Sequence, residues 1–306
     1  IVFVNQRRTA TTTTLSTSPA ASMVGEVVTL TASVAPANGT GTPTGTVAFS
    51  DGTAGIGSCT LASGSCSITT GTFAFGSRSL TATYTQAATE YSFTTSSTTG
   101  THVVSRYPAT VAITSSAPSG AAYGASVTFT VRVDATTGIA PSGSVAVSDG
   151  TAGIGSCTLT AIDATSASCT VSSSTLTGGT RTINATYAGD ARLLPTSATP
   201  LSQTITANPT TTTLVVTPAS SVYGQALTLA ASVTDGPGTP GGTVAFSDGT
   251  TPLGSCTLSG GSCSISVSTL AAGAHSLVAR YAGSANYAAS DSAAIERTVA
   301  EAPTRT

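Results

Sequence analysis

The segment SDGTAGIGSC occurs twice without change, at residues 50–59 and 148–157, and it returns as SDGTTPLGSC at residues 247–256. Its period is about one hundred residues, which is too long for one unit of a solenoid and close to the size of a β-sandwich domain. The chain of 306 residues therefore carries three copies of one domain-sized unit.

Other segments recur in the same frame and alternate apolar with polar side chains. They are VTLTASV (28–34), VTFTVRV (127–133) and LTLAASV (227–233), and later RSLTATY (78–84), RTINATY (181–187) and HSLVARY (275–281). This alternation is typical of strands with one buried face, and turn residues interrupt it every 8–12 residues or so. No long segment has a helical period. The pattern predicts an all-β fold of three tandem antiparallel β-sandwiches.

The third unit shows the strand pattern most clearly. We predict seven strands there, near residues 211–217, 226–234, 242–247, 253–258, 262–268, 275–282 and 292–300. The dipeptide Asp248-Gly249 between the third and fourth of these strands suits a tight hairpin turn. The first two units follow the same scheme.

Short Thr- and Pro-rich segments separate the units and suggest where the domains begin and end. The expected division is an N-terminal strand at residues 1–8, domains at 9–106 and 107–207, and a third domain with a C-terminal linker at 208–306. Pro108 and Pro209 stiffen the internal junctions, because proline fixes its own φ and keeps the preceding residue extended. We expect a semi-rigid string of domains.

The third unit also carries a resemblance to a known family. The run TTTTLVVTPASSVYGQALTLAASV, then GTVAFSDGTTPLGSCTL and STLAAGAHSLVARYAGSANYAAS, resembles bacterial immunoglobulin-like (Ig-like) repeats of surface and secreted proteins. The resemblance covers all three units and implies arrays that serve as stalks, adhesin shafts, fibre building blocks or spacers beside catalytic domains. The first unit departs from it, since Met23 replaces the Tyr and QAATEYSF (86–93) replaces the AGSANY loop (282–287).

The six cysteines form three local pairs, one in each unit, which predicts disulfides and an oxidising compartment. The expected pairs are Cys59 with Cys66, Cys157 with Cys169, and Cys256 with Cys263. If Cys59 lies opposite Cys66, Ala62 and Ser63 form a two-residue turn, and the bridge closes a hairpin without joining the two sheets. A metal site would need four converging ligands, and a redox pair would show the short CxxC spacing, so both alternatives are disfavoured.

No motif in the chain predicts catalysis, a cofactor or a metal ion. Asp51, Asp149 and Asp248 each stand alone in a turn, whereas calcium takes six to eight oxygens, so we assign them to turn chemistry. His102 and His275 have no acidic residue beside them, and His275 is expected to be a solvated strand end. We therefore predict that these residues form no enzyme, although scattered carboxylates leave a paired acid site formally open.

Aromatic and glycosylation signals also have structural explanations. Tyr123, Tyr187, Tyr223 and Tyr281 keep their places in the repeat, so we expect them to pack the sandwich with the hydroxyl on a backbone partner. Asn38-Gly-Thr and Asn184-Ala-Thr match the N-glycosylation pattern, which is frequent by chance.

The composition argues against nucleic acid and against a membrane span. The formal net charge is −2, all ten basic residues are Arg, and no basic run could follow a phosphate backbone, which argues against nucleic acid. No apolar window is long enough to span a membrane.

The first residues resemble the closing strand of a domain whose body is absent. Ile1 and Phe3 face one side of an extended segment, and Val2 and Val4 face the other. Two hypotheses remain open: the strand is donated to the open sheet edge of another subunit, or it is the tail of a preceding covalent domain.

These observations predict a structural protein at the bacterial cell surface or outside the cell. Its function would be a building block of a fibre, pilus-like filament or stalk, with copies of itself or neighbouring domains as partners. The alternatives are an adhesin or carbohydrate-binding array that recognises a surface receptor or glycan, and a spacer attached to a catalytic domain.

Overall fold

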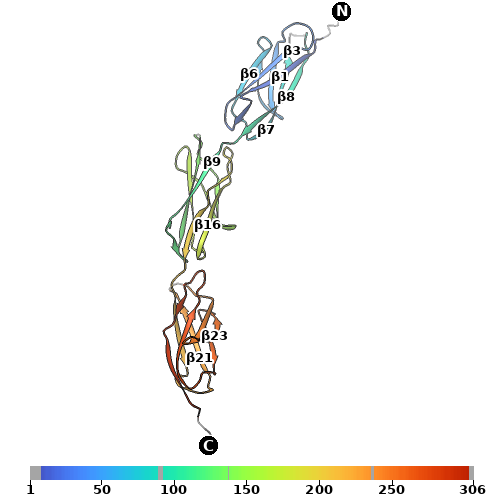
Figure 1. Cartoon of the computed structure of the whole chain (residues 1–306). Coiled ribbons are helices and arrows are strands. Elements are labelled where there is room, and N and C mark those ends of the chain that lie inside the picture. Colours follow the sequence, from blue (N-terminus) through green and yellow to red (C-terminus); the bar gives the residue numbers. More distant parts are fainter. Residues whose placement is uncertain (1–7, 89–91, 137, 236–237, 303–306) are drawn as a thin grey trace, which may run out of the picture.

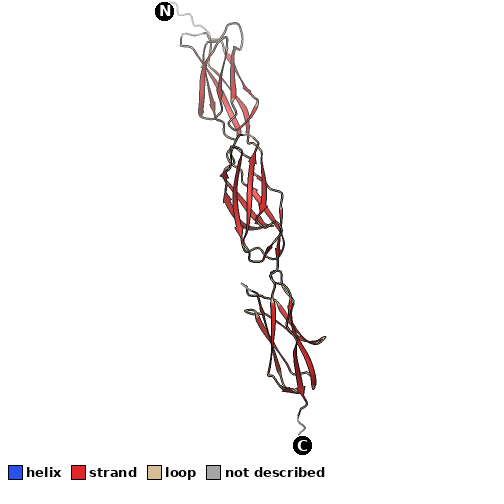
Figure 2. Ribbon diagram, turned by 90° about the vertical axis from the view of Figure 1, so that its left-hand side faces the viewer, coloured by secondary structure: helices blue, strands red, loops and turns tan. Residues whose placement is uncertain are grey.

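The computed structural model describes residues 8–88, 92–136, 138–235 and 238–302. These residues form three β-sandwiches placed end to end, with the chain termini at opposite ends of the molecule (Figure 1). All regular elements in the described part are strands (Figure 2), in agreement with the predicted all-β class. We refer to the sandwiches as domains 1, 2 and 3.

Domain 1 consists of two sheets that face each other. One contains three antiparallel strands in the order β1-β3-β6, and the other has the order β2-β8-β7-β4-β5. The short strand β2 runs parallel to β8, so the chain crosses from one sheet to the other between β1 and β2. The strand bounds are β1 Thr11–Ser18, β2 Ala21–Met23, β3 Val28–Pro36, β4 Gly45–Asp51, β5 Ala54–Thr60, β6 Ser65–Thr70, β7 Gly76–Gln86 and β8 Ser96–Ser105.

Domains 2 and 3 repeat this topology with small additions. In domain 2 the sheets are β14-β15-β11-β9 and β10-β18-β16-β12-β13, with β17 paired to β16. Its strands are β9 Ala109–Ser115, β10 Ala121–Ala122, β11 Val127–Ala135, β12 Ser144–Asp149, β13 Ala152–Thr158, β14 Thr160–Ala161, β15 Ser166–Ser173, β16 Gly179–Tyr187, β17 Thr196–Ser197 and β18 Leu201–Thr206.

In domain 3 the sheets are β19-β21-β24 and β20-β27-β25-β22-β23, with β26 paired to β25. Its strands are β19 Thr211–Thr217, β20 Ser221–Val222, β21 Leu227–Thr234, β22 Thr243–Asp248, β23 Thr251–Thr257, β24 Ser262–Val267, β25 Gly273–Tyr281, β26 Ser290–Asp291 and β27 Ile295–Ala300.

The seven strands predicted for the third unit all exist, with ends displaced by up to three residues. Two short strands, β20 and β26, were missed because a two-residue pairing leaves no periodicity in the sequence. The alternation does identify the core: Leu227, Leu229, Ala231 and Val233 on β21 are all buried. Each domain encloses a hydrophobic cluster of its own, as expected when one face of every strand points inward.

One buried tyrosine in each domain anchors the loop that enters the third long strand. The hydroxyls of Tyr84, Tyr187 and Tyr281 donate to the backbone oxygens of Thr44, Ser142 and Gly241 at 2.8, 2.9 and 2.7 Å. These three side chains are almost fully buried, so the hydrogen bond satisfies a polar group that would otherwise be costly inside the core.

The three disulfides join the cysteines that were expected to pair, but they connect the two sheets, which corrects the sequence-based expectation. Cys59 lies on β5, at the edge of one sheet, and Cys66 lies on β6, at the edge of the other. The bridges Cys157–Cys169 and Cys256–Cys263 likewise join β13 to β15 and β23 to β24. Each bridge therefore clamps the sandwich along one side.

The expected turn was displaced by one residue. Ala62 pairs with Ser65 through two backbone hydrogen bonds, so Ser63 and Gly64 form the turn, with φ of 53° and 81°. Positive φ at both central positions is the geometry that favours glycine, and Gly260-Gly261 take it in domain 3. Since β5 pairs with β4 and β6 pairs with β3, the two cysteines do not face each other across one ladder.

Candidate functional site: the junctions between domains

Two faces meet at each junction, and they are built from equivalent positions in every domain. The outgoing face contains the residue after the short parallel strand, which is Val24 in domain 1, Tyr123 in domain 2 and Tyr223 in domain 3. The backbone N–H of each donates to the last strand of its own domain, to the oxygens of Ser105, Thr206 and Ala300. Because Val24 makes this bond, it is Val24, and not Met23, that takes the place of the tyrosine in domain 1.

The incoming face is the loop that contains Arg192 and Leu194 in domain 2, and Asn286 and Ala288 in domain 3. This incoming loop is hydrogen-bonded to the linker. The backbone N–H of Tyr107 donates to Arg192 O at 2.8 Å, and that of Asn208 donates to Asn286 O at 2.9 Å. Leu194 and Ala288 return a hydrogen bond to the same linker residues, at 2.9 and 2.8 Å. Each linker is thus fixed to the domain that it enters within a few residues of leaving the previous one.

An aromatic pair holds domains 2 and 3 together. The rings of Tyr123 and Tyr287 lie 5.6 Å apart with an interplanar angle of 74°, an edge-to-face arrangement. Tyr123 packs against the hydrophobic clusters of both domains, and Tyr287 is a buried member of the domain 3 cluster. Burial, together with the neighbouring Tyr123 and Asp235, raises the pKa of Tyr287. The side chain of Tyr123 therefore links two cores.

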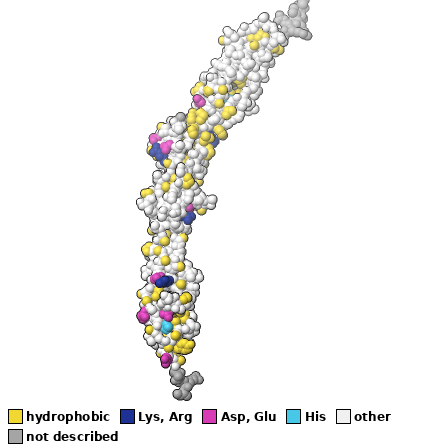
Figure 3. Space-filling model, in the orientation of Figure 1, with side chains coloured by type: hydrophobic (Ala, Val, Ile, Leu, Met, Phe, Trp, Pro, Cys, Tyr) yellow, Lys and Arg dark blue, Asp and Glu magenta, His cyan; other side chains and the backbone are white. Residues whose placement is uncertain are grey.

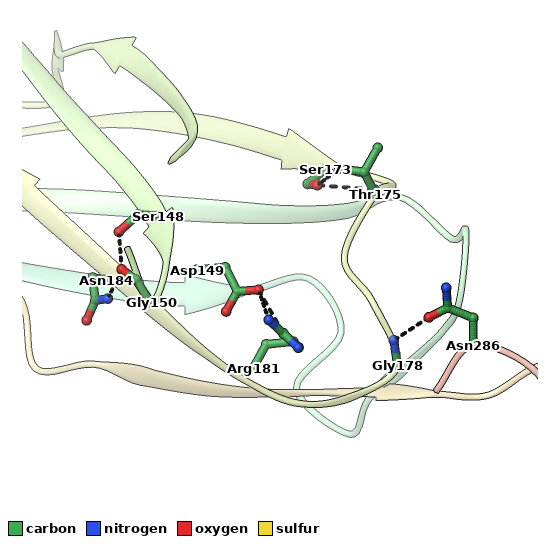
Figure 4. A network of polar contacts seen from close by, with 9 residues as sticks. All are labelled: Ser148, Asp149, Gly150, Ser173, Thr175, Gly178, Arg181, Asn184 and Asn286. Carbon is green, nitrogen blue, oxygen red and sulfur yellow. Dashed lines mark hydrogen bonds and ion pairs between the residues drawn. The ribbon is translucent and has the colours of Figure 1, made fainter. Parts of the chain in front are cut away.

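A hydrogen bond beside this pair fixes the incoming loop. The backbone N–H of Gly178 donates to Oδ1 of Asn286 at 2.9 Å (Figure 4). A side chain at position 178 would overlap the carbonyl oxygen of Ala285. Only glycine allows this close approach of two backbones. Asn208 is also buried and donates to Asp235 Oδ2 at 3.1 Å, so the linker is secured on its other side.

A cleft of about 750 Å³ opens at the same junction. Tyr123, Thr175, Asn208, Asp235 and Tyr287 are among its lining residues. The described lining contains one carboxylate and no cationic side chain. Clefts between domains are frequent places for ligands, and the carboxylate of Asp235 disfavours an anion here.

Domains 1 and 2 meet through different chemistry. The guanidinium carbon of Arg106 lies 4.5 Å from the ring centroid of Phe75, a cation–π geometry. Phe75 and Val27 remain about half exposed or more at this end of domain 1, at 50% and 62%. Figure 3 shows hydrophobic side chains gathered where the two domains meet. A Cβ at Gly25 would lie 3.1 Å from Nη2 of Arg192, so the incoming loop also approaches here.

The carboxylate of Asp190 orders that incoming loop of domain 2. Its Oδ1 accepts from the backbone N–H groups of Arg192 and Leu193, both at 2.8 Å, and its Oδ2 accepts from the N–H and hydroxyl of Ser142. Burial opposes ionisation, but these hydrogen bonds outweigh it and lower the pKa of Asp190.

The aspartate of each repeated SDG turn pairs with the strand residue beside it. Arg78 Nε lies 3.2 Å from Asp51 Oδ2, and Arg181 lies 2.7 Å from Asp149 Oδ2 (Figure 4). In domain 3 the partner of Asp248 is His275, at 2.6 Å. The carboxylates therefore do more than shape a turn.

His275 is not a solvated strand end, which corrects the prediction made for it. Its side chain is 11% exposed, Nδ1 lies on the Asp248 carboxylate, and Nε2 lies 2.8 Å from Ala271 O. Both ring nitrogens face acceptors, so the protonated ring is favoured. The hydrogen bond to Asp248, with that to Ala271, raises the pKa of His275.

His102 is enclosed inside domain 1. It is 0% exposed, its Nε2 lies 2.9 Å from Ser22 Oγ, and its Nδ1 lies 3.3 Å from Thr17 Oγ1. Ser22 is itself buried, at 5%. A serine and histidine sealed in this way have no route to a substrate, so their contact is structural.

The predicted tyrosines divide into two groups. Tyr187 and Tyr281 pack the sandwich and reach backbone oxygens as expected. Tyr123 packs against its own sandwich and also against the core of domain 3. Tyr223 is 56% exposed, so the prediction was wrong for Tyr223. Both lie at a domain end, where a repeat-locked position does not imply burial.

The residues that the structure describes hold no group of three or more His, Cys, Asp or Glu side chains that could bind a metal ion. The described residues form no helix, and therefore none that is long and apolar enough to cross a membrane. The strand Ile1, Val2, Phe3 and Val4 lies outside the described residues and stays a prediction.

Comparison with solved structures gives relatives of low sequence identity. A tetra-tandem repeat from the extending region of a large adhesion protein is 19% identical, with 95% of this chain and 74% of that one covered and a TM-score of 0.49. The Escherichia coli adhesin FdeC is 16% identical, with 94% and 96% covered and a TM-score of 0.34. A Ca²⁺-stabilized adhesin with which an Antarctic bacterium binds ice is 17% identical, with 99% and 76% covered and a TM-score of 0.28.

Among curated proteins, none matches this sequence. The family model described as bacterial Ig-like domain (group 3) matches three times, at residues 14–104, 113–206 and 214–300. The matches coincide with the three sandwiches and together cover most of the chain. The chain therefore belongs to the bacterial Ig-like domain family, of which it holds three tandem copies.

Proposed function

We propose that this chain is a non-enzymatic segment of an extracellular shaft on a bacterial surface, which is either a stalk or a filament. Its function would be to keep the two ends of the shaft apart. The observation that carries this proposal is the closure of both junctions by side-chain contacts across short linkers. A string with such junctions transmits position and force along its length. The disulfide across each sandwich supports an oxidising location outside the cytoplasm.

Small-angle X-ray scattering on the full chain tests the shaft. We expect the pair-distance distribution of an extended rod with limited bending. A compact profile would contradict the proposal. Electron micrographs of the native material distinguish its two forms, because a filament gives continuous fibres and a stalk gives isolated rods.

In the filament form, neighbouring copies would join end to end through a donated N-terminal strand formed by Ile1, Val2, Phe3 and Val4. An open sheet edge accepts such a strand through its unpaired backbone groups. Deletion of residues 1–6 should then abolish polymerisation and leave three folded domains. A full chain that stays monomeric at high concentration would exclude donation and favour the hypothesis that these residues close a preceding covalent domain.

A second candidate function is adhesion to a glycan, and the cleft between domains 2 and 3 favours it. Two tyrosine rings supply apolar surface, while Asn208, Asp235 and Thr175 supply hydrogen-bonding groups. Titration with neutral oligosaccharides such as maltotriose and cellotriose, followed by amide NMR, tests the cleft. Shifts confined to Asn208, Asp235 and Tyr287 would support it, and unchanged spectra at millimolar ligand would exclude these sugars.

A further inference from the structure

The outgoing faces of the three domains differ at one position that decides which loop can dock. Gly178, which precedes β16, corresponds to Phe75 before β7 and to Ala272 before β25. At the junction of domains 2 and 3 this position is in direct contact with the incoming loop, through the hydrogen bond from Gly178 N to Asn286 Oδ1. Phe75 at the other junction instead lies under the guanidinium of Arg106.

Gly178 is needed for docking and not for the fold of domain 2. Its φ lies outside the left-handed region, so its own backbone would accept a side chain, unlike the following Gly179 at φ +108°. The obstacle to a Cβ comes entirely from domain 3, from the backbone of Ala285. A backbone atom cannot rotate away as a side chain can. The sensitivity of position 178 therefore belongs to the interface alone.

We propose that Gly178 is a specificity-determining residue that makes the outgoing face of domain 2 an acceptor for the Asn286-Tyr287 loop of domain 3. Tyr123 supplies the aromatic contact, but the tyrosine is not sufficient. Domain 3 carries the equivalent Tyr223, 56% exposed, beside Ala272. The Cβ of Ala272 stands where an identical loop would place a carbonyl oxygen. The outgoing face of domain 3 therefore excludes a second domain of the domain 3 type in this geometry.

The size of the residue at this position sets the order of the domains through a steric clash. A glycine at this position admits the loop, and any side chain excludes it, so an array built from nearly identical domains still has a preferred sequence of neighbours. Specificity of this kind depends on a clash with the wrong partner as much as on contacts with the right one. The inference holds whether the array serves as a shaft or as an adhesin.

The first test is Gly178→Ala in the full chain, with Gly153→Ala as the matched control. Gly153 lies in the same domain, has a backbone that accepts a side chain, and has open space where the Cβ would be. ¹⁵N relaxation should give domains 2 and 3 one shared tumbling time in the wild type and in G153A. In G178A each domain should tumble separately and faster, with unchanged melting temperatures. A shared tumbling time in G178A would overturn the proposal.

The second test makes an acceptor from the face that lacks one. A four-domain chain is built in which residue 301 is followed by a second copy of residues 208–302. With Ala272 in place, the appended domain should tumble independently, and Ala272→Gly should couple it to domain 3. Asn286→Ala in the appended copy should remove that coupling. If the appended domain is coupled with Ala272 present, or stays independent with A272G, glycine does not set the specificity. Either result leaves the shaft proposal intact, because the native junctions are unchanged.

Discussion

The two junctions use the same backbone positions with opposite choices of side chain. Between domains 2 and 3, a large residue follows the short parallel strand, Tyr123, and the smallest residue stands at the loop, Gly178. Between domains 1 and 2 the sizes are exchanged, with Val24 at the first position and Phe75 at the second. Each outgoing face thus presents one aromatic ring. In domain 2 that ring meets Tyr287 of the next domain, whereas in domain 1 it lies under Arg106, which directly precedes the linker residue Tyr107.

One junction therefore joins two aromatic rings, while the other places a cation over a ring. Both linkers are also hydrogen-bonded to the domain that they enter. Tyr123 joins two hydrophobic clusters, whereas the guanidinium of Arg106 lies over the ring of Phe75 and that of Arg192 lies beside Gly25. We therefore expect the 2–3 junction to be the stiffer of the two.

Reduction of the disulfides should have the largest effect on stability, and it should not change the junctions between domains. Reduction of each bridge is expected to destabilise its own domain by about 2–3 kcal/mol, with the longer loop of Cys157–Cys169 at the upper end. Calorimetry with and without reductant measures the loss, and scattering at ambient temperature monitors the shape. Free thiols in unreduced protein would contradict the cysteine pairing. A change of shape before unfolding would contradict the expectation that the disulfides stabilise the domains without affecting the junctions.

Removal of the aromatic bridge should have the next largest effect. Tyr123→Ala deletes an edge-to-face pair worth about 0.5–1.5 kcal/mol beyond its buried area. The junction should loosen, with a broader range of domain 2–3 orientations in scattering and ¹⁵N relaxation. Tyr223→Ala is the matched control, since it removes an equivalent but exposed ring. An equal response in both variants would mean that the pair does not hold the junction.

A smaller effect is expected at the other junction. Arg106→Ala removes a cation–π contact worth about 0.5–1 kcal/mol at an exposed site. It should increase bending between domains 1 and 2 and leave domains 2 and 3 coupled. Arg132→Ala serves as the control, because Arg132 pairs with Asp134 on the surface of domain 2. If R106A loosens the chain more than Y123A does, the proposed ranking of the junctions is wrong.

The smallest effect concerns pH and separates domain 3 from the other two. The folded-state pKa of His275 is raised by Asp248, so protonation stabilises domain 3 fully below the ordinary histidine pKa of 6.5. That contribution is lost as the pH rises through the higher folded-state value. We expect a decline of a few tenths of a kcal/mol, the usual size for a partly exposed ion pair.

Urea unfolding of the full chain between pH 6 and pH 8.5 measures this decline. His275→Arg reproduces the arginine found at the same place in domains 1 and 2 and should remove it. A decline of the same size in H275R would assign the pH dependence to another group.

Strand alternation and cysteine spacing predicted part of the fold from the sequence. The alternation in LTLAASV identified four buried residues of β21, because every second side chain of a strand shares one face. The local spacing of Cys59 and Cys66 identified the pair but not its geometry. Whether the two strands share one ladder or lie in facing sheets depends on the strands with which each of them pairs, β5 with β4 and β6 with β3.

The junction residues were harder to predict. Repeat-locked tyrosines at 123 and 223 look alike in sequence, yet one bridges two domains and the other is exposed. Histidine at 275 gave no hint of its partner, because Asp248 is distant in sequence and reaches it only when β22 lies beside β25. Contacts of this kind join positions that no local pattern relates.

By itself, the sequence determined the number of domains, their all-β class, the core face of each strand and the cysteine partners. These features depend on periodicity and on short separations along the chain, which a single sequence records directly. Only the tertiary structure decided that the disulfides join the sheets, that Asp248 pairs with His275, and that Gly178 and Tyr123 receive the loop of domain 3. The physical reason is that these contacts depend on distances between separate elements, and at position 178 a single Cβ is enough to obstruct the contact.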